Sequence, residues 1–281
     1  MKMDLHCHTS FSDSSFSVEK VIEQAQKNGV THLAITDHDT TAGIELAQKI
    51  GQAKGVEIIP GIEISGYDYK RERRAHILGL YITPGHEALT ELCEPYVEAR
   101  HNASYEIVTR LMDKGYKMTW EEVEELAAAG NGVYKQHIMH ALIKQRYTNE
   151  IYGELYRKLF FKGSRNQEPG LAHVKIPYID AVKAIQAIRK AGGIPILAHP
   201  GQYLSFEALP EWVEEGLAGV EVWHPIHSVD DERQAEELAN KYSLIKTGGS
   251  DCHGFYGDED VPVGSFFVTE EILQELYKHK E

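Results

Sequence analysis

The sequence has few cysteines and no long apolar run. Its three cysteines, Cys7, Cys93 and Cys252, make no disulfide framework and leave one of them over. No stretch approaches the ~20 apolar residues that a membrane-spanning helix needs, and the first residues lack the apolar core of a signal peptide. We therefore expect a protein of the reducing cytoplasm, without membrane association.

Positive charge is also scarce. The 281 residues include 29 Lys and Arg against 43 Asp and Glu, which gives a net charge of −14. A surface of this sign is unsuited to long duplex nucleic acid, whose phosphates need basic contacts. It does not exclude a small phosphorylated substrate, because bound cations reverse the local sign of charge. The 15 His point to cations held by nitrogen and oxygen ligands.

Strand and helix patterns alternate in the first and last parts of the chain. Short apolar runs predict strands at 3–7, 31–36, 56–64 (interrupted by Pro60 and Gly61), 75–82, 194–198, 219–223, 244–248 and 265–268. Helical spacing predicts helices at 18–28, 42–53, 179–191, 206–215, 229–242 and from 270. Residues 65–74 are charged and predict a loop. The alternation favours an α/β fold with a mainly parallel sheet.

The middle of the chain has no strand pattern. Helical patterns at 87–114, 120–129, 135–145 and 150–161 are separated by glycines, and 164–173 predicts a loop. We therefore predict a small all-helical domain, residues 85–163, inserted into a larger domain formed by 1–84 and 164–281.

Histidines and carboxylates gather at the ends of the predicted strands. His6 and His8 end the first strand with both rings on one face, and Asp13 follows. Others come singly along the chain, at His38, Glu63, His76, His199, Asp251 and His253. One strand-end His is usually solvated or hydrogen-bonded. Repeated placement at the edge where α/β folds build their sites predicts a centre for several metal ions.

Some neighbours of these residues have simpler explanations. Asp37 and Asp39 flank His38, and Asp39 is expected to cap the following helix. Cys7 and Cys252 alternate with predicted ligands and so face the packed interior. We assign neither cysteine as a nucleophile.

Six short motifs stand in a characteristic order along the chain: DLHCHTSFSD, ITDHDT, GIEIS, HILGLYI, LAHP and GSDCHG. In content and order they resemble the polymerase-and-histidinol-phosphatase (PHP) family of metal-dependent phosphoesterases. The resemblance runs from residue 3 to about residue 264. It is strongest to stand-alone bacterial members with a helical cap, and it implies a distorted (β/α)7 barrel with the cap inserted.

The resemblance also implies two or three divalent ions, Mn, Fe or Zn. Nine positions carry the residue types that the family pattern expects, and Ser14, where many relatives have Gly, changes a turn and not a ligand. By motif position the nine form three groups around a shared glutamate: His6, His8, Glu63 and Asp251; Glu63 with His76 and His199; and Asp13, His38 and His253.

Five further residues are candidates for contact with substrate. Residues 133–142 resemble the relatives' Arg-x-His at the head of a cap helix, with Lys135 in place of Arg and His137 matching. Lys keeps the charge but lacks the two-pronged donor, and a solvated helix start is the alternative for Lys135. Lys175 returns from cap to barrel and is placed to face a cleft. His224 and His227, near another strand end, are candidates to protonate the leaving oxygen as general acid, with a slight preference for His227.

The resemblance implies hydrolysis of a small phosphorylated metabolite: a nucleoside 3′,5′-bisphosphate, a cyclic phosphate or a short RNA end. A metal-bridging hydroxide would attack phosphorus in line, while the cations neutralise the developing charge. Histidinol phosphatase is an alternative that the cap disfavours. A non-catalytic metal-binding module is disfavoured by the full ligand set, and an amidohydrolase-like reaction on a non-phosphate bond is a third alternative. No obligate protein partner is evident.

Overall fold

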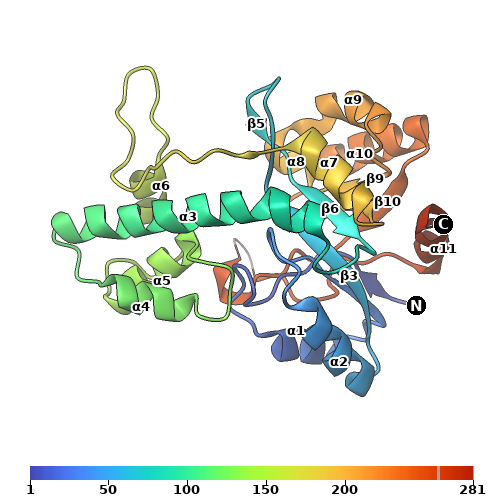
Figure 1. Cartoon of the computed structure of the whole chain (residues 1–281), viewed down its shortest axis with the longest axis horizontal. Coiled ribbons are helices and arrows are strands. Elements are labelled where there is room, and N and C mark those ends of the chain that lie inside the picture. The colour runs from blue at the N-terminus through green and yellow to red at the C-terminus, as the bar shows by residue number, and fades with distance from the viewer. Residues whose placement is uncertain (258–259, 281) are drawn as a thin grey trace.

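A curved sheet of seven strands forms the larger part of the molecule (Figure 1). The computed structural model describes residues 1–257 and 260–280. In spatial order the strands are β1 (Met3–Asp4), β2 (His32–Ile35), β3 (Glu57–Ile64), β6 (Ile77–Leu80), β8 (Ile194–Leu197), β9 (Gly219–Trp223) and β10 (Ile245–Gly248).

The sheet is mainly parallel and nearly closes on itself. Each strand runs parallel to its neighbours except β6, which is antiparallel to both β3 and β8. Beyond β1 and β10 the chain continues the pairing: the Leu5 amide donates to the Gly248 carbonyl at 3.2 Å and the Asp251 amide to the His6 carbonyl at 2.8 Å. The predicted α/β fold with a distorted seven-stranded barrel is confirmed.

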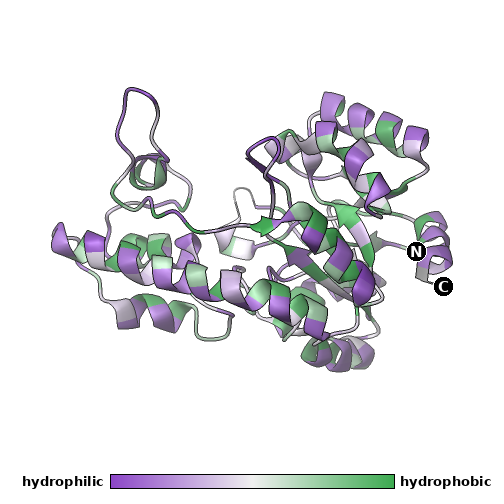
Figure 2. Ribbon diagram, turned by 45° about the horizontal axis from the view of Figure 1, so that its top comes forward, coloured by the Kyte–Doolittle hydropathy of each residue, from purple (hydrophilic) through white to green (hydrophobic). Residues whose placement is uncertain are grey.

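Apolar strands and amphipathic helices build this part. Short, fully buried runs such as Ile194–Leu197 are covered on both faces: Ile194 and Ile196 lie in the inner cluster, and Leu197 packs with the outer helices. Outside lie α1 (Val18–Lys27), α2 (Ile44–Lys54), α7 (Ala181–Lys190), α8 (Pro200–Tyr203), α9 (Leu209–Glu214), α10 (Val229–Tyr242) and α11 (Glu270–Lys280). These helices carry hydrophobic and hydrophilic residues on different faces (Figure 2).

The predicted helical insertion has a core of its own. It comprises α3 (Glu87–Asp113), α4 (Trp120–Leu126), α5 (Lys135–Lys144) and α6 (Glu154–Phe160). Residues such as Val108, Val123 and Met139 form one apolar cluster there, whereas Leu89 and Cys93 at the start of α3 belong to the barrel's cluster. One continuous helix therefore joins the two parts (Figure 1). The boundaries at 85 and 163 stay a prediction.

The prediction that residues 65–74 form a loop is wrong. The segment forms a hairpin of β4 (Gly66–Asp68) and β5 (Arg73–Arg74), and β7 (Ile179–Asp180) adds a third strand beside β4. Strands of two or three residues around a charged turn show no apolar alternation, so the sequence pattern does not reveal them.

Several other boundaries differ from expectation. The first strand stops at Asp4, whose buried carboxylate accepts hydrogen bonds from the amides of His6, Ser250 and Gly264. The helix predicted from 179 begins at Ala181, because Asp180 caps it through the amides of residues 182 and 183. The helix at 206–215 is split into a 3₁₀ turn, Ser205–Ala208, and α9. Residues 265–268 form no strand, only a single bridge at 268.

Pro60 does not interrupt β3. The first half of β3 pairs with β2 up to Pro60, and the second half pairs with β6 from Gly61 onward. Pro60 therefore lies at the changeover between two partners, where a residue without an N–H is tolerated.

The three cysteines are free and buried. Cys7 and Cys252 pack into an apolar cluster beside α1 and α2, as expected from their alternation with polar residues. No helix in the described part of the chain is long and apolar enough to cross a membrane. The cytoplasmic location stays a prediction.

The barrel interior gives a stability prediction. Leu78 of β6 is fully buried in the inner cluster, so Leu78→Ala leaves a cavity and should lower the free energy of unfolding by about 2–5 kcal/mol. Leu46→Ala, on the exposed side of α2, should change it by less than about 0.5 kcal/mol. Urea titration measures both. Equal small losses would contradict close packing inside the barrel.

Candidate metal centre

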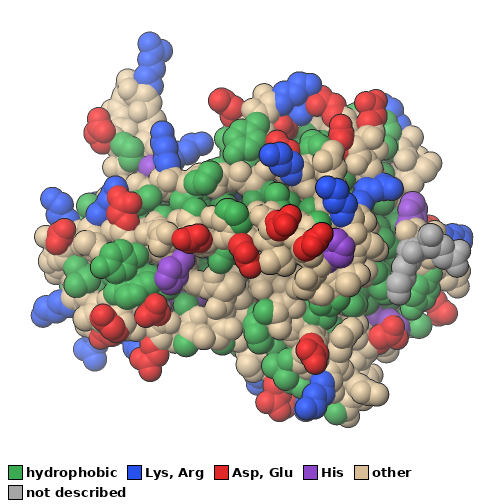
Figure 3. Space-filling view, viewed as in Figure 1, with side chains coloured by type: hydrophobic (Ala, Val, Ile, Leu, Met, Phe, Trp, Pro, Cys, Tyr) green, Lys and Arg blue, Asp and Glu red, His purple; other side chains and the backbone are tan. Residues whose placement is uncertain are grey.

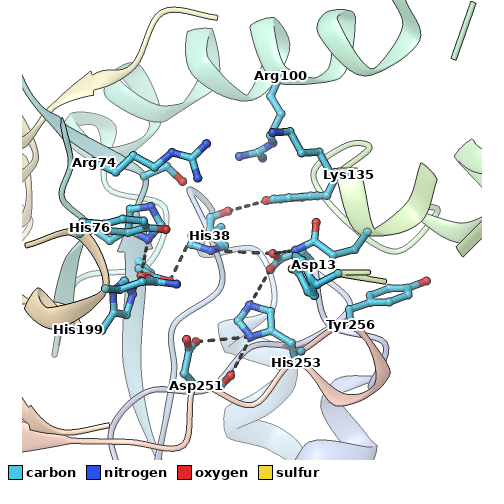
Figure 4. Close-up of a pocket in the computed structure, with 18 of the residues that line it drawn as sticks. Asp13, His38, Arg74, His76, Arg100, Lys135, His199, Asp251, His253 and Tyr256 are labelled. Carbon is cyan, nitrogen blue, oxygen red and sulfur yellow. Dashed lines mark hydrogen bonds and ion pairs between the residues drawn. The ribbon is translucent and has the colours of Figure 1, made fainter. Parts of the chain in front are cut away.

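The nine predicted ligands converge on one edge of the barrel. Figure 4 labels six of them, Asp13, His38, His76, His199, Asp251 and His253. Most lie at or after the carboxyl ends of parallel strands: His6 and His8 after β1, His38 after β2, Glu63 as the last residue but one of β3, His199 after β8, and Asp251 and His253 after β10. His76 precedes β6. Because β6 is antiparallel, its beginning lies at the same edge as the ends of its neighbours.

Glu63 lies at the middle of the cluster with each oxygen facing different imidazoles. Its Oε1 is 2.8 Å from Nδ1 of His76 and 2.9 Å from Nε2 of His199. Its Oε2 is 3.1 Å from Nε2 of His8 and 3.2 Å from Nδ1 of His38. A carboxylate placed in this way can serve two cations at once.

Two aspartates border the other side of the cluster. Asp251 Oδ1 lies 3.2 Å from Nε2 of His6 and 3.1 Å from Nε2 of His8. Asp13 Oδ1 lies 3.2 Å from Nε2 of His253 and 3.8 Å from Nδ1 of His8. His8 therefore stands between the two aspartates.

These contacts define groups whose ligand atoms lie within 4.8 Å of one another. One group of four is His6, His8, Glu63 and Asp251, and another is His8, Asp13, His38 and His253. A third is His38, Glu63 and His76. The first matches the group expected from the sequence, while His8 and His38 each border two groups. Several clusters of His, Asp and Glu are thus consistent with a multinuclear metal site.

The chemistry of the cluster fits divalent cations. Buried polar atoms without a hydrogen-bond partner include Nδ1 of His8, Oδ1 of Asp13 and Oδ1 of Asp251, and such groups are costly unless something binds them. Nε2 of His6 and Nε2 of His8 approach to 3.2 Å. Nitrogen and oxygen donors that point at one another around small gaps are what Mn²⁺, Fe²⁺ or Zn²⁺ require.

The charge of the cluster leads to the same conclusion. Burial raises the pKa of Asp13, Glu63 and Asp251, but the surrounding histidines lower it more, so each carboxyl ends below its usual range. Burial lowers the pKa of His76 to about 4, which leaves a neutral ring free to hold a cation. Among the described residues, the ion-pair partners of these three carboxylates are all histidines.

Glu221 is a buried carboxylate that the sequence interpretation missed. It lies inside the apolar strand β9, with Oε1 3.1 Å from Nδ1 of His6 and Oε2 2.8 Å from the amide of His199. Burial raises its pKa, but His6 and His224 outweigh this and lower it to about 2. A carboxylate on the far nitrogen of a ligating histidine fixes the ring's orientation. A single Glu within an otherwise apolar strand was the available signal.

The two candidate general acids are placed differently. His224 lines the cleft, with Nε2 3.2 Å from Oδ2 of Asp251, and its Nδ1 accepts from the Ile226 amide. Among the described residues that line the cleft, His227 is not found. Its Nδ1 contacts the Val222 carbonyl at 2.8 Å, and its Nε2 accepts a hydrogen bond from the Gly201 amide. This placement favours a structural position for His227 and a contact with the cluster for His224.

The predicted substrate-binding residues also separate. Lys135, at the start of α5, lines a cleft of about 500 Å³ above the cluster. Lys175 is exposed and lies outside the described lining. His137 is buried, and its Nδ1 accepts from the Tyr134 amide at 3.0 Å, which caps α5. Of the three, Lys135 alone reaches the cleft in the described part of the chain.

Residues of the cap hold the loops that carry the ligands. Nε2 of Gln136 donates to Oδ2 of Asp13 at 2.9 Å, and Nδ2 of Asn131 donates to the His38 carbonyl at 2.8 Å. The cap therefore fixes the open side of the metal centre. No local sequence pattern indicates these contacts, since each joins residues far apart in the chain.

Asp39 does not cap α2, contrary to expectation. Gly43 stands at that helix start. The Asp39 carboxylate instead accepts from the amide and hydroxyl of Ser65 and from Arg100 of α3 at 2.7 Å. The aspartate lies too many residues before the helix to cap it, and its backbone is left-handed, with φ 58°. The Asp39 carboxylate therefore links the end of β3 to α3 of the cap.

Backbone geometry at the cluster is unusual. His199 and Asp251 both have positive φ, 24° and 49°, which is costly for residues other than glycine and is typical of functional sites. Gly249 precedes Asp251, and a Cβ there would lie 2.4 Å from the Cβ of His6. The ends of β1 and β10 approach this closely only because residue 249 is glycine.

The contact between Glu221 and His6 gives a second prediction. Glu221→Gln keeps the shape but removes the charge behind His6, so the affinity for the ion at His6 should fall about 10- to 100-fold. Competition with a chelator at fixed pH measures this. Glu236→Gln is the control. Glu236 is an exposed residue of α10 that pairs with Lys246, so this variant should bind metal as the wild type does. Wild-type affinity in Glu221→Gln would rule out this support.

Comparisons with known proteins agree with this geometry. Residues 4–191 match the PHP domain family. The chain is similar in structure to a protein from Bifidobacterium adolescentis described as a metal-dependent phosphoesterase, with a TM-score of 0.87 and 26% identity, and the match covers 99% of this chain and 96% of that one.

Three relatives with assigned activities match almost the whole chain. The phosphoribosyl 1,2-cyclic phosphate 1,2-diphosphodiesterase of Eggerthella lenta is 44% identical, covering 90% of this chain and 95% of that protein. A 5′-3′ exoribonuclease of Haemophilus influenzae is 30% identical, covering 90% of each. A 3′,5′-nucleoside bisphosphate phosphatase of Chromobacterium violaceum is 27% identical, covering 89% and 87%. The chain therefore belongs to the PHP family and is a metal-dependent phosphoesterase of the stand-alone bacterial type.

Proposed function

We propose that this phosphoesterase hydrolyses a cyclic phosphate diester on a small phosphorylated sugar. The relative with 44% identity carries such an activity in its name. The observation that carries the proposal is the cleft of about 500 Å³ that opens directly onto the His, Asp and Glu cluster. A cleft of this size suits one small molecule.

We assign the nine residues His6, His8, Asp13, His38, Glu63, His76, His199, Asp251 and His253 as ligands of two or three divalent ions. Nitrogen and oxygen donors favour Mn, Fe or Zn. Such ions supply an activated water and neutralise the oxygens of the reacting phosphate. Glu63, with one oxygen toward His76 and one toward His8, is the proposed shared ligand.

The protein itself positions the substrate and its ligands. Lys135 faces the cleft and donates to a phosphate oxygen of the substrate. His224, through Nε2, holds Asp251 in place. Arg100 is already paired with Asp39, and its guanidinium carbon lies 3.9 Å from the ring centre of Tyr134. Arg100 therefore supports the wall of the cleft.

The substrate proposal has a direct test. Metal-loaded protein is assayed for phosphate release and ring opening with a ribose 1,2-cyclic phosphate carrying a 5-phosphate, a nucleoside 3′,5′-bisphosphate and a short 5′-phosphorylated RNA. We expect the highest kcat/KM with the cyclic phosphate. Preference for the RNA or the bisphosphate would replace this substrate class, and no turnover of any of them would reject the proposal.

His8→Ala tests the ligand assignment. His8 is fully buried between Glu63 and Asp251, so its loss should remove at least one bound ion and lower kcat about 10³-fold or more. Elemental analysis and the assay above measure this, and circular dichroism checks the fold. His32→Ala, paired with Glu57 away from the cluster, is the control. Wild-type activity in His8→Ala would contradict the assignment.

The charge of Lys135 gives a pH prediction. Burial, and then the nearby charge of Arg74, lower the pKa of Lys135 to about 8. The ammonium is present below this pH and is lost above it, so kcat/KM should fall as the pH rises through about 8. Lys135→Arg keeps its charge and should move the fall to higher pH. Lys175→Arg, outside the described lining, is the control. An unchanged profile in Lys135→Arg would exclude Lys135 as the titrating group.

A further inference from the structure

One segment of the cap, residues 131–140, contacts three barrel loops that carry predicted ligands. The segment includes the start of α5, and the loops follow β1, β2 and β10. The ligands on these loops, Asp13, His38 and His253, form with His8 one of the groups whose donor atoms lie within 4.8 Å of one another. The cap segment therefore meets the barrel at one group of ligands in particular.

The cap segment holds the loop after β1 at two points. Nε2 of Gln136 donates to Oδ2 of Asp13 at 2.9 Å. This leaves Oδ1 of Asp13 directed at the cluster, 3.2 Å from Nε2 of His253. The backbone amide of Asn131 donates to the Phe11 carbonyl at 3.1 Å, so the backbone of this loop is fixed as well as its aspartate.

The loop after β2 is held through the backbone of His38. Its carbonyl accepts from Nδ2 of Asn131 at 2.8 Å and lies 3.3 Å from the Tyr134 hydroxyl. The Tyr134 hydroxyl donates to Oδ1 of Asn131 at 2.8 Å, and Arg100 of α3 donates to the same oxygen at 3.3 Å. The side chain of Asn131 is fixed at both ends, and it fixes His38 in turn.

The loop after β10 reaches into the cap through Tyr256. The backbone amide of Tyr256 donates to the His253 carbonyl at 3.2 Å, and its hydroxyl lies 2.8 Å from Nδ1 of His140 in α5. Its buried ring belongs to the apolar cluster of the cap. Tyr256, His253 and Asp13 lie on the same side of the metal centre (Figure 4).

A second group of four ligands, His6, His8, Glu63 and Asp251, is supported from within the barrel. Nδ1 of His6 lies 3.1 Å from Oε1 of Glu221 in β9. Oδ2 of Asp251 lies 3.2 Å from Nε2 of His224, which follows the same strand. The two groups share His8 but differ in what orients their other members.

We propose that the cap segment completes the ion site of His8, Asp13, His38 and His253, so that the affinity of this site depends on contacts with the cap. The affinity of the site of His6, His8, Glu63 and Asp251 is set within the barrel. This proposal rests on the ligand assignment in the proposed function and deepens it. It makes Gln136, Asn131 and Tyr256 positioning residues for one ion.

The chemistry of Gln136 suits this role. A carboxylate whose second oxygen already accepts a hydrogen bond is oriented before the ion arrives, so less freedom is lost on binding. The donor is a neutral amide and does not cancel the charge that Asp13 offers to a cation. A Lys or Arg at position 136 would pair with Asp13 and weaken its hold on an ion.

Coupling of this kind acts in both directions. If the cap contact strengthens ion binding, the bound ion stabilises the cap contact by the same free energy. The ion at Asp13, His38 and His253 should therefore hold the cap segment against the barrel.

Gln136→Met tests the proposal, because it keeps the length of the side chain and removes the donor. Manganese-loaded full-length protein is exposed to a graded series of chelator concentrations, and elemental analysis counts the ions that remain. We expect one ion to bind about 10- to 100-fold more weakly than in the wild type, with the others unchanged. Electron paramagnetic resonance of the partly stripped protein should differ from that of Glu221→Gln, because that variant weakens the ion at His6.

Gln145→Met is the matched control. Gln145 is exposed at the carboxyl end of the same helix, so this variant should hold all its ions as the wild type does, and circular dichroism checks both folds. Wild-type affinities in Gln136→Met, or equal weakening of every ion, would overturn the proposal and leave the ligand assignment intact. A wild type that binds no manganese would reject the ligand assignment and this proposal together.

Tyr256→Phe is a second, milder variant. It keeps the ring in the cap cluster and removes the hydroxyl that contacts His140. The ion weakened in Gln136→Met should bind about 2- to 10-fold more weakly here, the range for one neutral hydrogen bond. Weakening of a different ion would count against the proposal.

Hydrogen exchange measures the reverse direction of the coupling. Saturation with Mn²⁺ should slow amide exchange in residues 131–140 of the wild type, and should slow it less in Gln136→Met. Exchange that does not respond to Mn²⁺ in the wild type would overturn the coupling. Neither this measurement nor the chelator series requires turnover, so both remain decisive if no cyclic phosphate is hydrolysed.

Discussion

The site depends on the buried carboxylate of Glu63 and its ring of imidazoles. A carboxylate at the end of β3, removed from water, is very costly unless positive charge accompanies it. In the described structure that charge does not come from Lys or Arg: its ion-pair partners are His6, His8, His38, His76 and His199. These rings point nitrogen lone pairs or protons at the same two oxygens. Divalent cations held by these residues would satisfy both the carboxylate and the rings, so the cluster would be stabilised as a set rather than residue by residue.

The barrel's one antiparallel strand explains why so few strands supply so many ligands. In a purely parallel sheet, each strand contributes only its carboxyl end to the edge. Because β6 runs the other way, His76 reaches this edge from the start of its strand and makes a 2.8 Å contact with Glu63. The sequence contained this information: His76 preceded its apolar run whereas the other histidines followed theirs. The position of a polar residue relative to its strand thus indicates the strand's direction as well as a site.

Residues next to apolar runs were predictable from the sequence, and residues defined by distant contacts were not. Most cluster members stood out because they flank a buried strand, His76 before its strand and the others after theirs. Glu221 was hidden inside a strand, and Gln136 and Arg74 looked like ordinary polar residues of a helix start and a charged turn. Their significance lies in partners more than sixty residues away, such as Asp13 for Gln136 and the Tyr178 hydroxyl for Arg74. Local pattern carries no information about such pairs, and the same reason hid the short β4–β5 hairpin.

The chain as a whole is acidic, whereas the cleft is lined by Arg74, Arg100 and Lys135 as well as by Asp13, Glu63 and Asp251. Acidic and basic side chains are interspersed over the face seen in Figure 3, and the chain as a whole carries −14. A long polyanion would meet this surface over its whole length and be repelled, since its affinity depends on many basic contacts. A small anion meets only the cleft, where Arg74, Lys135 and the cations proposed for the cluster face it within low-dielectric walls that strengthen attraction. A protein of this charge is therefore better suited to small phosphate esters than to long polyanions.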